Sequence, residues 1–328
     1  MASNGNGDAP SLTLDDFHTE DAAMAVCLTR AKVAAATDLP VLILGESGTG
    51  KTLLARAIHD SSSRARSPFV SFNSAALSDT LLDSQLFGHE RGAFTGAQNR
   101  VKGKFELAGG GTLFIDEIAD MSSSAQSKIL RAVEYGEFER LGSEALCSAD
   151  VRLISATHVP LSRLVESDRF RQDLYFRISG IALTIPPLRE RIRDLPLLLA
   201  AEIGRAARKQ QKAIVGLNTT AAERLFAYHW PGNLRELSRV IDTAVALATT
   251  ETIDRDAVLL ETVCPSRPGN GEALASDEIL TLAEAERRHI ERVLERFGGN
   301  KRRAAHALNV SRSTLDRKLA QPVDRAHS

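Results

Sequence analysis

Short apolar runs and helical patterns alternate along the first part of the chain, between residues 17 and 187. Such alternation favours an α/β domain with a mainly parallel sheet, because helices then cover both faces of buried strands. The five runs that predict strands are Val41–Leu44, Phe69–Asn73, Thr112–Asp116, Val151–Thr157 and Ile181–Ile185. From residue 188 to residue 260 the pattern is helical and includes no convincing strand, which predicts a small all-α subdomain.

The two ends of the chain differ from these parts in composition. Residues 1–16 are polar and rich in Gly, Asn and Ser, which predicts a disordered leader. Residues 261–279 contain the stretch CPSRPGNGEALAS and predict a linker, because Pro, Gly and Ser break regular structure. Residues 280–328 fit three short helices, with breaks at Gly298-Gly299 and at Asn309-Val310-Ser311.

Composition narrows the class of protein only slightly. The 328 residues are 43% hydrophobic and 25% charged, as in soluble globular proteins. The formal net charge is −1, so any signal for nucleic-acid binding has to be local. The 3 cysteines are widely spaced, suggest no metal site and are most simply reduced thiols. Because no apolar run has membrane-spanning length and the N-terminus does not resemble a signal peptide, we expect a cytoplasmic protein.

The stretch GESGTGKT fits the pattern G-x-x-x-x-G-K-[ST] of a phosphate-binding loop. It lies between a predicted buried strand and a helix predicted from Lys51 to Asp60. Glycines let the backbone wrap around an anion, and N–H groups at a helix N-terminus face it. Lys51 can reach the β- and γ-phosphates of ATP, and Thr52 can hold Mg²⁺. The predicted ATP-binding residues of the loop are Gly45, Glu46, Ser47, Gly48, Thr49, Gly50, Lys51 and Thr52.

An ordinary glycine-rich turn is the alternative for this loop, but it does not explain why strand, glycines, Lys-Thr and helix occur together. Two carboxylates, Asp116 and Glu117, end the predicted strand Thr112–Asp116. Asp116 can join the Mg²⁺ shell, and Glu117 can polarise an attacking water. Strands often end in acids, so the pair alone is weak evidence. Because parallel strands end at one edge of a sheet, the pair and the phosphate-binding loop together predict a site of ATP hydrolysis.

The stretch LFGHERGAFTGA ends in six residues with one large aromatic among small ones: Gly92, Ala93, Phe94, Thr95, Gly96 and Ala97. It resembles the signature loop of sigma-54-dependent transcriptional activators, the bacterial enhancer-binding proteins of the AAA+ ATPases. The resemblance covers residues from about 17 to 319 and implies an AAA+ P-loop NTPase with a helical lid, followed by a helix-turn-helix. In that family the loop contacts the sigma-54 factor. Phe94 suits an apolar anchor for a partner, although a packing residue under a tight turn is the alternative.

The resemblance also implies roles for polar residues elsewhere. Asn73 matches the switch residue that holds the Walker B glutamate, with an Asn that caps a turn as the alternative. Arg171 and Arg177, in FRQDLYFR, match the arginines that reach the ATP of a neighbouring subunit, although surface arginines are usually only solvated charges. Arg235, in WPGNLREL, matches the sensor II arginine. His158 stands where the sensor I asparagine is usual, which leaves γ-phosphate sensing open.

A basic segment lies near the C-terminus, between Gly298 and Ala320. It fits two short helices around a tight turn and resembles the Fis-type DNA-binding domain of this family. Six basic residues and one acid give it a local charge of +5, which favours DNA over the alternative of a solvated basic hairpin. The residues expected at DNA are Lys301, Arg302, Arg303, Arg312, Ser313, Asp316, Arg317 and Lys318.

Three functions fit these motifs. The first is an activator that binds upstream enhancer DNA and hydrolyses ATP to convert the closed complex of sigma-54 RNA polymerase into an open complex. A generic AAA+ DNA-remodelling or replication-initiator-type ATPase has no reason for the loop at residues 92–97. A repressor that uses ATP only to oligomerise has no reason for the catalytic acids and arginines. We therefore expect the first.

The family also implies ATP and Mg²⁺ as cofactors, and a homo-oligomeric ring that is usually a hexamer. It implies control by a domain ahead of the ATPase. About sixteen residues precede Phe17, too few for such a domain. We therefore expect either control by a separate regulatory protein or a truncated product.

Overall fold

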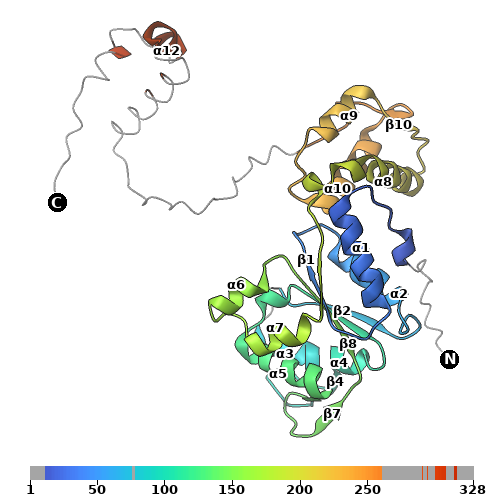
Figure 1. Cartoon of the computed structure of the whole chain (residues 1–328), viewed down its shortest axis with the longest axis vertical. Coiled ribbons are helices and arrows are strands. Elements are labelled where there is room, and N and C mark those ends of the chain that lie inside the picture. The colour runs from blue at the N-terminus through green and yellow to red at the C-terminus, as the bar shows by residue number, and fades with distance from the viewer. Residues whose placement is uncertain are drawn as a thin grey trace. The chain divides into compact units, whose positions relative to one another are not determined.

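The structure is a computed structural model that describes residues 12–75, 78–260 and 300–307 and the single positions 290, 294, 314 and 315. The chain divides into two compact units, Met1–Val263 and Cys264–Ser328 (Figure 1). Each unit is described by itself. Within the described residues, no helix has both the length and the apolar character needed to cross a bilayer.

The first unit is built on a five-stranded parallel sheet with the strand order β2-β5-β8-β1-β9. The strands are β1 (Val41–Leu44), β2 (Phe69–Asn73), β5 (Thr112–Asp116), β8 (Arg152–Thr157) and β9 (Ile181–Thr184). The three predicted strands at residues 41–44, 69–73 and 112–116 are confirmed at both ends. The other two are each one residue shorter than predicted, because β8 begins after Val151 and β9 ends before Ile185. All five strands run in one direction, so their carboxyl ends meet at one edge of the sheet.

Helices cover both faces of this sheet (Figure 1). Ile43 and Phe114 pack into the core on the face of α1 and α2, whereas Leu42 and Ile115 pack into the core on the opposite face. This alternation follows from the period of a strand, whose successive side chains point to opposite faces. The helices of this unit before the lid are α1 (Ala22–Ala35), α2 (Lys51–Asp60), α3 (Asp79–Phe87), α4 (Lys104–Leu107), α5 (Ser123–Tyr135), α6 (Leu161–Glu166) and α7 (Gln172–Ile178).

Two small antiparallel hairpins extend from the α/β part. One pairs β3 (Gly88–His89) with β4 (Val101–Lys102), and the other pairs β6 (Glu137–Glu139) with β7 (Leu146–Ser148). A bridge between His89 and Leu141 joins the two hairpins. Gly88 has φ +82°, and a Cβ there would lie 2.5 Å from the carbonyl oxygen of Val101, so only glycine fits. The loop at residues 92–97 lies between the two strands of this first hairpin, which therefore forms its base.

The lid follows β9 and has its own hydrophobic core around the fully buried Trp230. Its helices are the short 3₁₀ turns at Leu188–Glu190 and Ile192–Asp194, then α8 (Leu195–Gln210), α9 (Thr219–Phe226) and α10 (Asn233–Leu247). The prediction that residues 188–260 contain no strand was wrong. A parallel pair joins β10 (Gly216–Leu217) to β11 (Thr252–Ile253). Each strand has two residues, too few for an alternating pattern to appear in the sequence.

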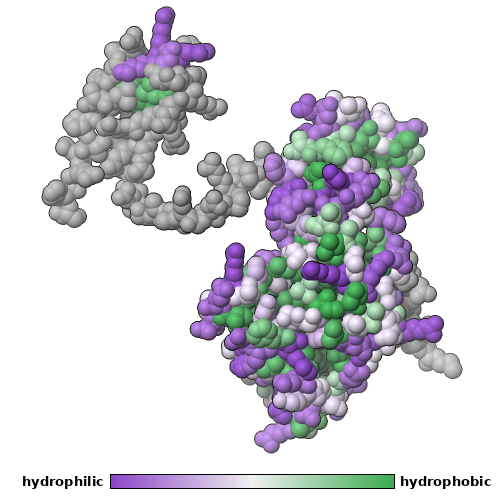
Figure 2. Space-filling model, in the orientation of Figure 1, coloured by the Kyte–Doolittle hydropathy of each residue, from purple (hydrophilic) through white to green (hydrophobic). Residues whose placement is uncertain are grey.

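In the second unit the described helix is α12 (Lys301–Ala307). Lys301, Arg302 and Arg303 are exposed on it, and the described part of this unit shows both hydrophilic and hydrophobic surface in Figure 2. The backbone N–H of Arg303 donates to the side-chain oxygen of Asn300, 3.2 Å away. The whole predicted linker, residues 261–279, lies outside the described residues, as do Arg312, Ser313, Asp316, Arg317 and Lys318.

Candidate functional site

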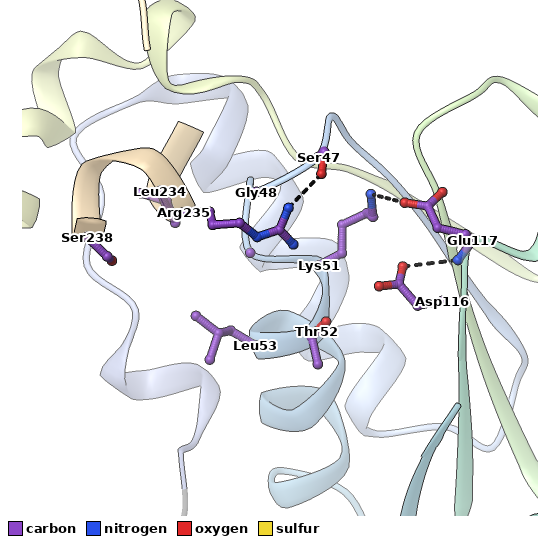
Figure 3. Close-up of a pocket in the computed structure, with 11 residues that line it drawn as sticks. Ser47, Gly48, Lys51, Thr52, Leu53, Asp116, Glu117, Leu234, Arg235 and Ser238 are labelled. Atoms are coloured by element: carbon purple, nitrogen blue, oxygen red, sulfur yellow. Dashed lines mark hydrogen bonds and ion pairs between the residues drawn. The ribbon is translucent and has the colours of Figure 1, made fainter. Parts of the chain in front are cut away.

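A pocket of about 240 Å³ lies around the loop that joins β1 to α2 (Figure 3). Gly48 and Gly50 have φ angles of +80° and +102°, a left-handed backbone that glycine adopts without strain. Gly50 is the N-cap of α2, so the first N–H groups of the helix open into the loop. This loop and helix end can cradle phosphate oxygens, as the sequence predicts.

Lys51 links the loop to the end of β5. Its buried ammonium donates to the carbonyl oxygen of Gly45 at 2.9 Å and to Oε1 of Glu117 at 3.2 Å. Thr52 and Asp116 line the same pocket (Figure 3). The structure therefore brings together the hydroxyl and the carboxylate that the sequence predicts for Mg²⁺, in a pocket whose backbone fits phosphate.

The two adjacent carboxylates lie in different electrostatic environments. Burial raises the pKa of Asp116, and the neighbouring charge of Glu117 adds to this rise against the opposing charge of Lys51. Burial also acts to raise the pKa of Glu117, but the hydrogen bond from His158 and the charge and hydrogen bond of Lys51 lower it below its usual value. Glu117 is therefore the better anion of the pair.

Glu117 has φ +55°, a left-handed backbone that is uncommon for a residue with a side chain. Two local hydrogen bonds support this turn. Its backbone N–H donates to Oδ1 of Asp116 at 3.1 Å, and the hydroxyl of Ser74 donates to its carbonyl oxygen at 2.7 Å. Ser74 is buried and also donates to the carbonyl oxygen of Asp116 at 3.0 Å. No motif in the sequence assigns a role to Ser74; its position just after β2, the strand beside β5, is the signal that could have identified it.

His158 follows β8, which lies between β5 and β1 in the sheet. Its Nδ1 lies 2.7 Å from Oε2 of Glu117, and its backbone nitrogen lies 3.3 Å from the same oxygen. From the sequence, His158 is only unusual at its position. Its contact with Glu117 could not be predicted, because it depends on β8 lying beside β5 in the sheet.

Asn73 does not contact Glu117 in this structure. Its side-chain oxygen accepts a hydrogen bond from the backbone N–H of Ala75 at 2.8 Å, although its backbone pairs with Asp116 in the sheet. The side chain thus caps a turn, the alternative considered above. A role of Asn73 toward the Walker B glutamate stays a prediction.

The start of α10 lies directly against the phosphate-binding loop. Arg235 donates to the hydroxyl of Ser47 at 2.8 Å (Figure 3), and the backbone N–H of Leu234 donates to the carbonyl oxygen of Gly48 at 2.9 Å. A Cβ on Gly48 would lie 2.3 Å from the carbonyl oxygen of Gly232. The lid therefore places Arg235 in the pocket, where a sensor II arginine is expected.

An ion pair also joins the loop to the lid. Glu46 accepts two hydrogen bonds from Arg189, at 2.6 and 2.8 Å, and a third from Asn233 at 3.2 Å. The hydrogen bond from Arg189 lowers the pKa of Glu46 despite partial burial. Of the predicted ATP-binding residues, Ser47, Gly48, Gly50, Lys51, Thr52 and Arg235 line the pocket, whereas Gly45, Glu46 and Thr49 do not.

The two arginines predicted to act between subunits do not line this pocket. Arg171 pairs with Asp173 through two hydrogen bonds of 3.0 and 2.7 Å. Arg177 donates to the carbonyl oxygen of Glu134 at 3.3 Å. Both side chains are exposed, so they are available to a neighbouring molecule.

The loop at residues 92–97 is a compact turn outside the cores. Gly92 and Gly96 have φ angles of +85° and +108°, and the N–H of Gly92 donates to the carbonyl oxygen of Ala97 at 2.9 Å. Phe94 is half-buried, with its ring edge-on to His89 at a centroid distance of 5.0 Å. Phe94 belongs to none of the three hydrophobic cores, and its role as an anchor for a partner stays a prediction.

The second hairpin touches this loop. Gly142, between β6 and β7, has φ +76°, and a Cβ there would lie 2.8 Å from the Cβ of Ala93. A side chain at position 142 would therefore have to displace Ala93 or the backbone around it.

Comparisons with known proteins identify three segments. Residues 17–184 match the Sigma-54 interaction domain, residues 189–269 the AAA+ ATPase lid domain, and residues 281–321 the Bacterial regulatory protein, Fis family. The chain is 44% identical to the transcriptional regulatory protein ZraR of Escherichia coli (strain K12), over 96% of this chain and 71% of that protein. It is 43% identical to the Nif-specific regulatory protein of Azotobacter vinelandii, over 83% of this chain and 52% of that protein.

A solved structure shares the fold over most of the chain. NtrX from Brucella abortus, crystallised in complex with ATP, is 33% identical with a TM-score of 0.67, over 93% of this chain and 68% of NtrX. The phosphate-binding loop, the paired carboxylates, the glycine-bracketed loop and these three matched segments agree with one another. The chain therefore belongs to the sigma-54-dependent transcriptional regulators, with an AAA+ lid and a C-terminal Fis-type helix-turn-helix domain.

Proposed function

We infer that this chain is an ATP-hydrolysing activator that converts the closed complex of sigma-54 RNA polymerase into an open complex. The observation that carries this proposal is a single pocket that gathers Lys51, Thr52, Asp116, Glu117 and Arg235 from three separate parts of the fold. The loop with Phe94 is outside that pocket, as a partner contact has to be. The relative NtrX, whose title records ATP, supports the nucleotide.

Each residue of the pocket has a role that follows from its position. The loop N–H groups and Lys51 bind phosphate oxygens, and Thr52 with Asp116 holds Mg²⁺. ATP, when bound there, supplies the phosphoryl group that is transferred to water. Glu117 orients that water and accepts its proton, since the hydrogen bond from His158 and the charge of Lys51 favour the ionised form of its carboxyl group. Arg235 contributes positive charge from the lid.

The remaining elements supply the partners. Arg171 and Arg177 reach the pocket of a neighbouring subunit in a homo-oligomeric ring, which is a hexamer in this proposal. The basic C-terminal segment binds upstream enhancer DNA through its positive charge.

Paired measurements of ATP turnover and of open-complex formation on one sigma-54 promoter test the proposal. Glu117→Gln should keep ATP binding and lower turnover by about two to four decades, since that is the usual contribution of a positioned base. Glu166→Gln is the matched control, because Glu166 is exposed on α6 and does not line the nucleotide pocket. Parental turnover in Glu117→Gln would remove Glu117 from its role.

The second arm separates hydrolysis from remodelling. Phe94→Ala and Thr95→Ala should keep most of the turnover and lose open-complex formation, because neither residue lines the nucleotide pocket. Val215→Ala, at an exposed apolar residue of the lid, is the control for a lost surface side chain. If Phe94→Ala opens the promoter as well as the parent protein, the loop is not the contact for sigma-54.

A further inference from the structure

The carboxylate of Glu117 is held from two sides. Lys51 donates to Oε1 at 3.2 Å, whereas His158 approaches Oε2 with both Nδ1, at 2.7 Å, and its backbone nitrogen, at 3.3 Å. The 2.7 Å contact is the shortest of these and joins a side chain on the end of β8 to one on the end of β5. Glu117 is therefore fixed across the middle of the sheet edge.

Lys51 and His158, the two residues that hold the Glu117 carboxylate, differ in their other contacts. Lys51 belongs to the phosphate-binding loop, so in the proposed function its ammonium serves phosphate oxygens and leaves Glu117. His158 does not line the nucleotide pocket. Asn73, another polar side chain near this edge, accepts a hydrogen bond from the backbone N–H of Ala75. Of the described side chains that contact Glu117, His158 is thus the one that remains during hydrolysis.

We propose that His158 is the positioning residue for Glu117: its Nδ1–H and backbone N–H hold Oε2, so that Oε1 faces the pocket when Lys51 turns to phosphate. The proposal rests on the proposed function and deepens it, since it assigns the orientation of the water-activating carboxylate to β8. His158 touches neither substrate nor water in this role and is not itself a catalytic residue.

The chemistry of the imidazole suits this task. Nδ1 donates a hydrogen bond to a carboxylate in the neutral Nδ1–H tautomer and in the cation alike. The side-chain nitrogen of asparagine lies at the same number of bonds from Cβ and is also a donor. His158→Asn therefore keeps the donor and removes the ring, whereas His158→Leu keeps similar bulk and removes the donor.

Steady-state kinetics of the full chain test the positioning role. His158→Leu should lower kcat by about a hundredfold, the effect of a misplaced reacting group, with little change in the KM for ATP. His158→Asn should return most of the lost kcat. His229→Leu, at an exposed histidine of the lid, is the matched control and should behave like the parent protein.

Nitrogen-15 NMR detects the hydrogen bond between His158 and Glu117 without a need for ATP turnover. In nucleotide-free protein with ¹⁵N-labelled histidine, the His158 signal should be that of an imidazole protonated at Nδ1, assigned by its loss in His158→Asn. Glu117→Ala should move this signal toward the Nε2–H tautomer that a free histidine prefers, while the His229 signal stays in place.

The outcomes separate this proposal from the function on which it rests. Parental kcat in His158→Leu, equal losses in the Leu and Asn variants, or a His158 signal that ignores Glu117→Ala would each overturn the positioning role. A parent protein without any turnover overturns the proposed function instead, and the NMR arm then still reports whether His158 holds Glu117.

Discussion

Single residues at the end of β5 set the charge of the candidate site. Asp116 and Glu117 are adjacent in the chain, yet their pKa values are displaced in opposite directions from their ordinary values. The cause of the opposite pKa shifts is geometric. His158 and Lys51 both contact Glu117 and lower its pKa, whereas burial is the largest influence on the pKa of Asp116. A pair of carboxylates separated in this way can divide the work, one toward a cation and one toward a proton.

This environment gives a prediction about stability. The folded pKa of Asp116 lies above its ordinary value of 3.8, because burial disfavours the anion. Its favourable contribution is therefore present below pH 3.8 and is lost as the pH rises through the folded pKa. Ionised Asp116 thus destabilises the nucleotide-free protein at pH 7. Asp116→Asn should raise the melting temperature at pH 7 and have a smaller effect near pH 4.

Thermal unfolding of the parent protein and Asp116→Asn at both pH values, without nucleotide, measures this difference. Asp120→Asn, at a nearby acid in the 3₁₀ turn Ile118–Asp120, is the control for the loss of one negative charge. A melting temperature that falls at pH 7 in Asp116→Asn would contradict the account.

At the scale of elements, the sequence predicts β1, β2, β5 and α2 well because their apolar patterns are local. The start of β8 was less clear, since the strand begins with Arg152, a buried charge where an apolar residue is expected. The contacts that shape the pocket could not be predicted from the sequence, because they join residues that are far apart in the chain. Glu46 meets Arg189 across 143 positions, and only the packing of the lid brings them together.

The ion pair between Glu46 and Arg189 should contribute to the docking of the lid. Exposed pairs typically contribute about 0.2–1 kcal/mol, and both side chains are partly exposed here, so we expect Glu46→Gln to lower the free energy of unfolding by that amount. Arg189 depresses the folded pKa of Glu46. The contribution is therefore present above pH 4.5 and is lost as the pH falls through the folded pKa.

Denaturant unfolding at pH 7 and at pH 3 measures this term. The double change Glu46→Arg with Arg189→Glu should recover part of what each single change loses. Glu190→Gln is the control, since Glu190 lies 3.9 Å from the same arginine and is more exposed. Additive losses in the double variant would show that the pair does not couple the loop to the lid.

At the scale of the whole molecule, we expect a neighbouring chain to complete the candidate site. Arg171 and Arg177 match the family's arginines but do not line the pocket, so we expect them to act in a ring. An Arg177→Ala subunit and a Lys51→Ala subunit should each lose about three to five decades of turnover alone. Mixtures should recover activity, because a mixed ring places an intact arginine beside an intact phosphate-binding loop.

Turnover is measured across mixing ratios, with ring formation followed by light scattering. Arg163→Ala, at an exposed arginine of α6, replaces Arg177→Ala in the control mixtures and should be active without a partner. Mixed rings that form but remain inactive at every ratio would argue against a site shared between subunits.

The contact between Gly142 and Ala93 has a consequence for energy conversion. The loop at residues 92–97 packs against the hairpin of β6 and β7, which does not line the nucleotide pocket. The conformation of the loop therefore depends on a contact with room for only a hydrogen atom at Gly142. In the proposed function, this contact would hold the loop in the pose that engages sigma-54. We expect a methyl group at position 142 to displace the loop, so that ATP is still hydrolysed while its free energy is released as heat instead of opening the promoter.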